Sequence, residues 1–424
     1  MNIDEMFCRL ARFELATAPR LHLIASENQM PAAARVPYLT DALTRYCFGS
    51  AEDTAWAWPG RGELAELEAA AATSMGVLLR AEFVNLKPVS GLSAMTVALS
   101  ALSGSAQTVF SLSEPDGGHG STQFVARRFG LYWQPLPVDP ATWCVDVQML
   151  ARRARSVDGP VLIYLDSFMA LFPHDLVAIR DAVGERAVIH YDGSHTLGLI
   201  AGCQFQNPLA EGADSLGGSV HKTWPGPTGK GVVATNNPDL ARQIDLHAAG
   251  WVSHHHPADI AALAISTAWM TDHAATYAAS VVGNARRLAA TLTDQGFTVC
   301  AAERGGTRSH QVWVDITPIC QAAAASRLLY DAGIVVNAID IPYLPEPGLR
   351  LGVQEVTFLG LTTEGVDELA TLMARLLIHR ESPHTIAPQV ADLRARYLTD
   401  HNHQAAEELA TQLRRAGREK PRTP

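Results

Sequence analysis

The sequence predicts an α/β protein with a mainly parallel sheet and a smaller α+β unit after it. In the middle of the chain the apolar run "VLIYLDSF" is followed by the helical pattern "HDLVAIRDAVGE" and then by the second run "AVIHYDGSH". This alternation is typical of parallel strands joined by helices. After about residue 270 a long helix is followed by several strands around the helix "QAAAASRLLYDAG". We therefore predict an N-terminal arm over 1–60, a large domain over 61–270 and a small domain over 271–424 that ends in a tail helix.

The composition narrows the class of protein. The chain has 424 residues, 47% of them hydrophobic, and a net charge of −10. This balance argues against nucleic acid or an anionic membrane as a partner. We expect no secretory signal and no membrane span, because the start has no basic segment before an apolar run and no apolar run reaches 18 residues. The six cysteines are scattered without a CxxC pair, which favours reduced thiols and a cytoplasmic location.

Polar residues follow several of the predicted strands. They are Ser167, then Asp192 and His195, then His221 and Lys222. Ligands of open α/β sheets bind at the carboxyl ends of the strands. These five residues are therefore the first candidates for a site.

Lys222 suggests a carbonyl cofactor. It is one of only four lysines in a chain that otherwise uses arginine for its cations, and an amine can lose its proton whereas a guanidinium in effect cannot. An imine to a carbonyl needs such an amine. If the cofactor is pyridoxal phosphate (PLP), its ring nitrogen needs an acidic partner. Asp192, thirty residues before Lys222, fits that role, and His195 is placed to reach other ring substituents.

The segment "KPVSGLSAMTVALSAL" offers a phosphate site. Ser90, Gly91 and Ser93 stand at the start of an Ala-rich helix, where backbone amides bind anions. Each of these signals alone is common, since a Ser-Gly pair before a helix is usually an N-cap. Their order and spacing relative to Asp192 and Lys222 make PLP the specific interpretation.

Seven segments, in order along the chain, carry a family resemblance. They are "LHLIASENQM", "LTDALTRYCFG", "PVSGLSA", "DGGHGS", "YDGSHTLGLIAG", "SVHKTWPGPTGKG" and "GLRLGVQEVTFLG". They resemble LIASEN, LTNKYAEG, PHSGSQAN, AHGGHLTHG, VDMAHVAGLVAAG, TTHKTLRGPRGG and GIRVGTPAVTTRG of serine hydroxymethyltransferase. The resemblance implies a fold-type I PLP-dependent transferase, aspartate aminotransferase-like, with a mainly parallel seven-stranded sheet in the large domain and a smaller α+β C-terminal domain.

The resemblance also implies roles for individual residues. Lys222 would form the imine with PLP, Asp192 would hold the pyridine nitrogen, and His119 would stack on the ring. Arg350 would grip the substrate carboxylate, and Tyr46 would reach the active site of the partner subunit in a homodimer. Further residues implied near the cofactor or the substrate are Ser90, Gly91, Ser93, Ser167, His195, Ser219 and His221 for the cofactor, and Ser26 for the substrate.

The run His254, His255 and His256 raises the question of a metal. Adjacent side chains do not point the same way on a strand or a helix, and no acidic cluster stands beside them in the sequence. We therefore predict no metal. In the family this region is a glycine-rich loop that faces the phosphate of the partner chain, so a phosphate-side or structural role and a plain surface position both remain open.

The departures from the family lie on the side that would face folate. Phe48 stands where the family has a glutamate that moves protons, and a phenyl ring cannot do so. Trp58, Gly120 and Thr228 also differ from the family's residues, and the segment "AIDIPYLPEPG" is short. The sequence therefore predicts a divergent, folate-independent member with retained PLP chemistry, in which Phe48 and Trp58 contact the substrate.

Several reactions fit this prediction. We favour cleavage or formation of a Cα–Cβ bond in an α-amino acid, by an aldolase-like or transaldolase-like reaction. The alternative is β-elimination, or decarboxylation with deamination, of an amino acid with a bulky side chain in specialised-metabolite biosynthesis. True serine hydroxymethyltransferase activity and an inactive partner subunit are less favoured, the latter because Lys222, Asp192 and Arg350 are all retained.

Overall fold

The computed structural model describes residues 1–48, 61–398 and 403–416. The chain forms two compact units. The large unit comprises Asn28–Ala279 with His401–Pro424, and the small unit comprises Met1–Glu27 with Ser280–Asp400. These boundaries differ from the predicted 1–60, 61–270 and 271–424.

Long-range pairing explains the difference in boundaries. Strand β1 (Leu21–Leu23) pairs in parallel with β13 (Ile334–Ile339), so the first residues of the chain join the small unit. At the other end, helix α15 (His403–Ala416) packs against α2 (Ala32–Arg35) within the large unit. Neither contact leaves a local pattern in the sequence.

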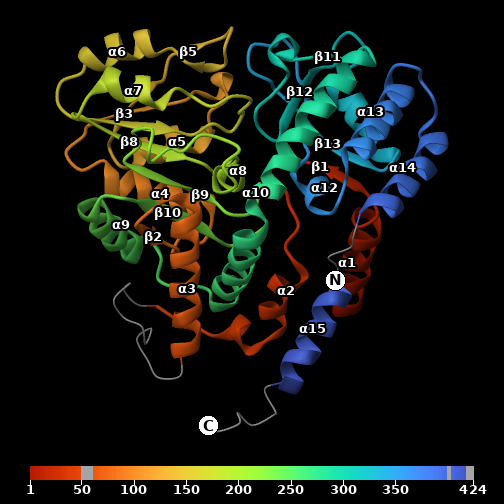
Figure 1. Ribbon diagram of the computed structural model, residues 1–424, viewed down its shortest axis with the longest axis horizontal. Helices are drawn as coiled ribbons and strands as arrows, with labels where there is room; N and C mark the ends of the chain where they lie inside the picture. Colours follow the sequence, from red (N-terminus) through yellow and green to blue (C-terminus); the bar gives the residue numbers. More distant parts are fainter. Residues whose placement is uncertain (49–60, 399–402, 417–424) are drawn as a thin grey trace. The chain divides into compact units, whose positions relative to one another are not determined.

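The large unit is built on a seven-stranded sheet, which confirms the predicted α/β class (Figure 1). The strand order is β2-β10-β9-β8-β7-β3-β4. Only β10 runs antiparallel to its neighbours, and the pairs from β9 to β4 are all parallel. The strands are β2 (Phe83–Asn85), β3 (Thr108–Ser111), β4 (Tyr132–Pro135), β7 (Val161–Leu165), β8 (Ala187–Asp192), β9 (Ser215–Ser219) and β10 (Gly231–Thr235), with a separate ribbon of β5 (Val138–Asp139) and β6 (Cys144–Val145).

Apolar helices cover this sheet. Helices α4 and α9 lie side by side (Figure 1), and α4 contacts β9 and β10 with a face rich in alanine and leucine that includes Ala98 and Leu99. The helices of the large unit, besides α2 and α15, are α3 (Gly62–Leu79), α4 (Gly91–Leu102), α5 (Gly120–Arg128), α6 (Val147–Arg155), α7 (Leu176–Val183), α8 (Leu197–Ala201) and α9 (Pro238–Trp251), with the 3-10 turns η1 (Val36–Leu39), η2 (Asp41–Thr44) and η3 (Glu114–Asp116). Helix α10 (Pro257–Asp294) begins in the large unit and ends in the small one.

The small unit contains a five-stranded sheet of order β1-β13-β14-β12-β11. Its pairs are antiparallel except for β1 with β13. The remaining elements are α1 (Ile3–Thr17), β11 (Thr298–Val299), η4 (Ala302–Arg304), β12 (Gln311–Asp315), α11 (Ala322–Asp331), β14 (Gly348–Gly352), α12 (Gln354–Phe358), α13 (Thr363–Leu377) and α14 (Pro383–Tyr397). None of the helices in the described part of the chain has the length and apolar character needed to cross a bilayer.

The topology places the candidate residues at one edge of the large sheet. Strand β8 ends at Asp192, Asp166 directly follows β7, and Lys222 lies three residues after β9. Because β7, β8 and β9 are parallel neighbours, their carboxyl ends meet at the same edge.

Candidate active site

A cavity of about 240 Å³ opens at the carboxyl ends of β7, β8 and β9, beside the start of α4. It brings together the predicted cofactor residues except Ser93. Its lining consists of Ser90, Gly91, Leu92, Met95, His119, Asp166, Ser167, Phe168, Asp192, Ser194, His195, Ser219, His221 and Lys222. Ser93 contributes its backbone N–H, which donates to Ser90 Oγ at 3.0 Å.

Asp192 is fixed by several donors. Tyr164 Oη donates to Asp192 Oδ2 at 3.0 Å, and the backbone N–H and Oγ of Ser194 donate to Asp192 Oδ1 at 3.0 and 2.5 Å. Ser194 Oγ in turn accepts the backbone N–H of Ser219 at 3.0 Å, which links β8 to β9. A buried carboxylate held in this way is suited to pair with a protonated ring nitrogen.

Asp166 is a second acid in the cavity and is not among the residues predicted from the sequence. Its carboxylate is buried and accepts the backbone N–H groups of Leu112 and His119, at 3.1 and 3.3 Å, and Thr122 Oγ1 at 2.5 Å. Burial raises the pKa of Asp166 to about 7, and the negative charge of Asp192 adds to the increase. The available signal was its place directly after β7, which is equivalent to that of Asp192 at the end of β8.

The backbone around Lys222 is held on both sides. Asn28 Nδ2 donates to the carbonyl of Lys222 at 2.6 Å and contacts Tyr277 Oη at 3.0 Å. Thr223 Oγ1 donates to the carbonyl of His195 at 3.0 Å. These contacts set where the lysine side chain begins, and Asn28 belongs to the motif segment from which only Ser26 had been selected.

Phe168 contacts the rings of two histidines that also line the cavity. Phe168 meets the ring of His119 edge to face, with 6.0 Å between centroids, and that of His195 in the same way at 5.6 Å. Burial lowers the pKa of His119, which favours the neutral ring. Ser167 Oγ lies 2.8 Å from Nε2 of His174, whose pKa burial lowers to about 4.

The start of α4 is shaped to receive an anion. Ser90 caps the helix, and a Cβ on Gly91 would lie 2.9 Å from Ser219 Cβ, so only glycine allows this close approach. Ser219 Oγ is buried, and no described residue bonds to it. Helix amides beside an unpartnered buried hydroxyl match the phosphate of PLP, while Asp192 and Lys222 match its ring nitrogen and its aldehyde. The residues present therefore fit this cofactor.

The predicted carboxylate-binding residues, Arg350 and Ser26, belong to the small unit. Arg350 lies on β14, is 2% exposed, and donates to Asn337 Oδ1 from Nη2 at 2.9 Å and from Nε at 3.3 Å. Burial lowers the pKa of Arg350 to about 10. Ser26 lies in the segment 24–27, to which Gln354 Nε2 donates two hydrogen bonds. Both residues are thus held on the framework of the small unit.

Tyr46 and Phe48 do not line the cavity of their own chain. Tyr46 Oη donates to the carbonyl of Ser253 at 2.9 Å, and its ring stacks on His254 with 4.5 Å between centroids. The Phe48 ring meets Tyr46 edge-on at 6.1 Å. Both side chains are about half exposed, at 47% each. Trp58 lies outside the described residues.

The histidine run is divided between two environments. The rings of His254 and His256 lie 4.2 Å apart, whereas His255 is buried with Nδ1 3.5 Å from Oε2 of Glu68. Within the described ranges, no three His, Cys, Asp or Glu side chains are arranged to hold a metal ion.

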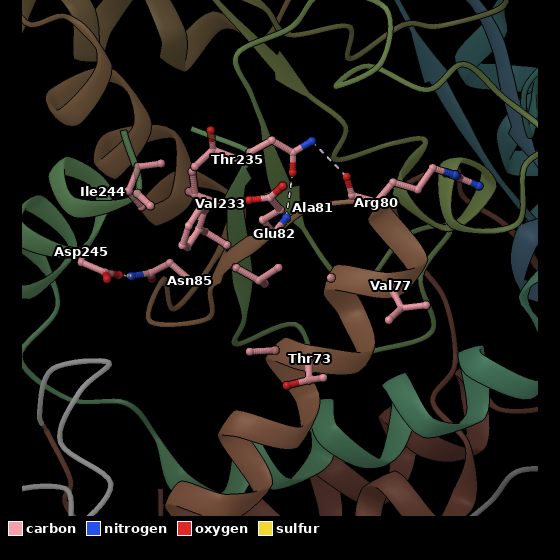
Figure 2. A pocket seen from close by; sticks show the side chains of 16 residues that line it. Thr73, Val77, Arg80, Ala81, Glu82, Asn85, Val233, Thr235, Ile244 and Asp245 are labelled. Atoms are coloured by element: carbon pink, nitrogen blue, oxygen red, sulfur yellow. Dashed lines mark hydrogen bonds between the residues drawn. The ribbon is translucent and has the colours of Figure 1, made fainter. Parts of the chain in front are cut away.

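A larger cavity of about 570 Å³ lies at the β2 edge of the sheet and is lined by residues of α3, β2, β10 and α9. Figure 2 shows Asn85 and Asp245 pointing toward each other, and Asn85 donates to Asp245 at 2.5 Å. Asn236 accepts the backbone N–H of Glu82 at 2.7 Å and donates to the backbone carbonyl of Arg80 at 3.2 Å. It contains none of the predicted site residues. The smaller cavity at the strand ends is therefore the candidate active site, despite its size.

Comparisons with known proteins agree with the fold and the cavity. Residues 16–373 match the family model "Serine hydroxymethyltransferase". A relative named L-threonine:uridine-5'-aldehyde transaldolase, from an Amycolatopsis species, is 38% identical over 82% of this chain and 86% of its own. The serine hydroxymethyltransferase of Korarchaeum cryptofilum is 35% identical over 89% of this chain and 91% of its own. The crystal structure of an L-threonine transaldolase from Pseudomonas fluorescens matches with a TM-score of 0.85 and 25% identity, over 97% of each chain.

The fold and the site define a PLP-dependent enzyme of fold type I. More specifically, the chain belongs to the serine hydroxymethyltransferase family. The resemblance, the enzyme class and the cofactor predicted from the sequence are confirmed.

Proposed function

We propose that this protein is a PLP-dependent transaldolase that acts on a β-hydroxy-α-amino acid of the threonine type. It would break the Cα–Cβ bond, release the side chain as an aldehyde, and join the remaining glycine fragment to a second aldehyde. The observation that carries the proposal is the cavity that unites Lys222, Asp192 and His119, in a chain whose folate-side position 48 is phenylalanine. The names of the Amycolatopsis and Pseudomonas relatives support the same reaction.

Three residues of the cavity would have different roles in the reaction. PLP, when bound, supplies an electron sink for the charge that develops at Cα. Asp192, held by Tyr164 and Ser194, would keep the opposing positive charge on the ring nitrogen. Lys222, once the substrate amine has taken its place on the cofactor, would accept the proton of the β-hydroxyl group as the Cα–Cβ bond breaks. It would return that proton to the new hydroxyl oxygen when the second aldehyde is joined. His119 would orient the ring from one face.

Substrate recognition would come from other segments. Arg350 would pair with the substrate carboxylate in a bidentate manner, next to Ser26. Tyr46, Phe48 and Trp58 would contact the second aldehyde or the side chain, with Tyr46 supplied to the partner subunit in a homodimer. The exposed position of Tyr46, away from the cavity of its own chain, supports such a shared site. We also propose a cytoplasmic location, which the scattered cysteines support.

Two other reactions are separated from the proposed one by their products. β-Elimination would give a keto acid and ammonia, and decarboxylation would release carbon dioxide. True serine hydroxymethyltransferase activity would need tetrahydrofolate and a proton-moving group at position 48, where phenylalanine stands.

The test is product analysis with purified protein, L-threonine and a panel of aldehydes. We expect acetaldehyde and a new β-hydroxy-α-amino acid in equal amounts, with no requirement for tetrahydrofolate. Keto acid or carbon dioxide as the main product, or serine-to-glycine conversion strictly dependent on tetrahydrofolate, would refute the proposal.

Cofactor attachment is tested separately from the reaction. Lys222→Ala and Lys222→Arg should both lose the visible absorbance band of covalently bound PLP on dialysis, because a guanidinium keeps the charge but forms no imine. A band that survives dialysis in either variant would show that another residue binds the cofactor.

A further inference from the structure

Asp166 lines the same cavity as Lys222, and none of the roles proposed above uses its carboxylate. We propose that Asp166 is a positioning residue that holds His119 against the face of the cofactor ring. This inference rests on the proposed function, because it gives His119 its task.

The Asp166 carboxylate accepts hydrogen bonds from both ends of the connection between β3 and α5. Asp166 Oδ1 accepts the backbone N–H of Leu112, just after β3, at 3.1 Å. Asp166 Oδ2 accepts the backbone N–H of His119, the N-cap of α5, at 3.3 Å, and Oγ1 of Thr122 in the first turn at 2.5 Å. The start of α5, from which the His119 side chain projects, is thereby fixed to the end of β7.

The neighbours of Asp166 strengthen the same attachment. Gly118 and Ser167 form an antiparallel bridge, and the backbone N–H of Met169 donates to the carbonyl of Gly117 at 2.9 Å. Phe168 contacts the His119 ring edge to face. A Cβ on Gly118 would lie 2.2 Å from the carbonyl oxygen of Leu112, so the connection is tightly folded. Ser167, Phe168 and Met169 therefore act together with Asp166 to limit where His119 can lie.

The residue type argues for a positioning role over simple packing. Burying a carboxyl group costs free energy, and here the nearby Asp192 adds repulsion. In return, a carboxylate accepts three hydrogen bonds with two oxygens, which an apolar side chain cannot do. An asparagine of the same size would turn its NH₂ group toward at least one of the donors and lose that bond. Asp166→Asn is thus a nearly isosteric test of the attachment.

The experiment compares wild type, Asp166→Asn, His119→Ala and the double variant, with Asp116→Asn as the control. Asp116 lies in the same connection, and its carboxylate accepts from Ser113. The first readout is the visible circular dichroism of bound PLP together with its dissociation constant, which needs no turnover. The second is kcat and KM for the transaldolase reaction.

We expect Asp166→Asn to change the cofactor dichroism and to lower kcat by about 10- to 100-fold, as small displacements in active sites do, with a smaller change in KM. In the His119→Ala background, adding Asp166→Asn should change kcat by less than about 3-fold. Asp166 is proposed to act only by holding the His119 side chain, and that side chain is absent in this background. Asp116→Asn should match wild type in both readouts. Wild-type dichroism and kcat in Asp166→Asn, or multiplicative losses in the double variant, would overturn the inference.

Two further arms keep the test decisive. If Asp166→Asn does not fold, Thr122→Val removes one of the three donors and should give the same change in dichroism with a smaller amplitude, while an unchanged spectrum and kcat would count against the inference. If wild type lacks transaldolase activity, the proposed function fails, and dichroism with PLP affinity still decides whether Asp166 positions His119.

Discussion

Gly218→Ala is predicted to disturb the cofactor site through a single added carbon. Gly218 lies in β9 with φ of 131°, a backbone conformation that residues with a Cβ rarely adopt. The new Cβ would lie 2.5 Å from Ser194 Oγ, 2.6 Å from Ser194 N and 2.8 Å from Asp192 Oδ1. Since all three atoms take part in the hydrogen bonds of the Asp192 carboxylate, the clash falls on the proposed partner of the cofactor ring.

The size of the effect follows from two costs. Holding a non-glycine residue at such a φ costs about 1–3 kcal/mol, and overpacking a buried site costs about 1–3 kcal/mol more. We therefore expect the free energy of unfolding to fall by about 2–6 kcal/mol. PLP should bind at least about 10-fold more weakly, which corresponds to about 1.4 kcal/mol lost when the Asp192 carboxylate is displaced.

The assay is urea unfolding of the apoenzyme together with PLP titration by absorbance. Gly283→Ala in helix α10 is the matched control, because its Cβ would meet no atom within 4 Å. It should leave PLP affinity unchanged and raise stability by up to about 1 kcal/mol, the helix preference of alanine over glycine. A Gly218→Ala protein within about 0.5 kcal/mol of wild type and with unchanged PLP affinity would refute the reasoning.

Three more predictions concern charge and assembly. The folded-state pKa of Asp166 is about 7, above its ordinary value of 3.8. The free energy of unfolding of the apoenzyme should therefore fall as the pH rises from about 4 to about 7, and urea unfolding of Asp166→Asn should not show this fall. Burial lowers the pKa of Lys230 from 10.5 to about 8, so stability should instead rise between about pH 8 and 10.5, and Lys230→Met should abolish this rise in the same assay. When Lys222→Ala and Tyr46→Ala subunits are mixed and allowed to exchange, about half of the dimers should contain one subunit of each kind, and each such dimer has one intact and one doubly altered site. The mixture should therefore regain roughly a quarter of wild-type activity. No recovery despite confirmed exchange would contradict a shared site.

The residues that meet in the candidate cofactor cavity could be predicted from local sequence. The acid at the end of β8, the lysine after β9 and the small residues at the start of α4 each occupy a place fixed by their own strand or helix. Parallel neighbouring strands then bring those places to one edge. For this reason Ser90, Asp192 and Lys222 line one cavity although the chain separates them by up to 132 residues.

Other parts depended on contacts between distant segments. Pairing of β1 with β13 moved the first 27 residues into the small unit, and a three-residue strand has no detectable pattern of its own. Asn28 was overlooked because its role is a bond to the backbone of Lys222, 194 positions away. Tyr46 carries a family motif, yet it packs on His254 rather than in the cavity of its own chain.

The sequence by itself determined the fold class and the cofactor, and it singled out Lys222 as the lysine proposed to bind that cofactor, because these depend on residue types at the ends of regular elements. Only the tertiary structure decided how the supporting groups are arranged. Asp166 shows the reason: its three donors come from a connection 44 to 54 residues earlier, and its raised pKa arises from burial beside Asp192. Burial and hydrogen bonding between distant segments are properties of the folded chain, so no local pattern around "LDSF" could express them.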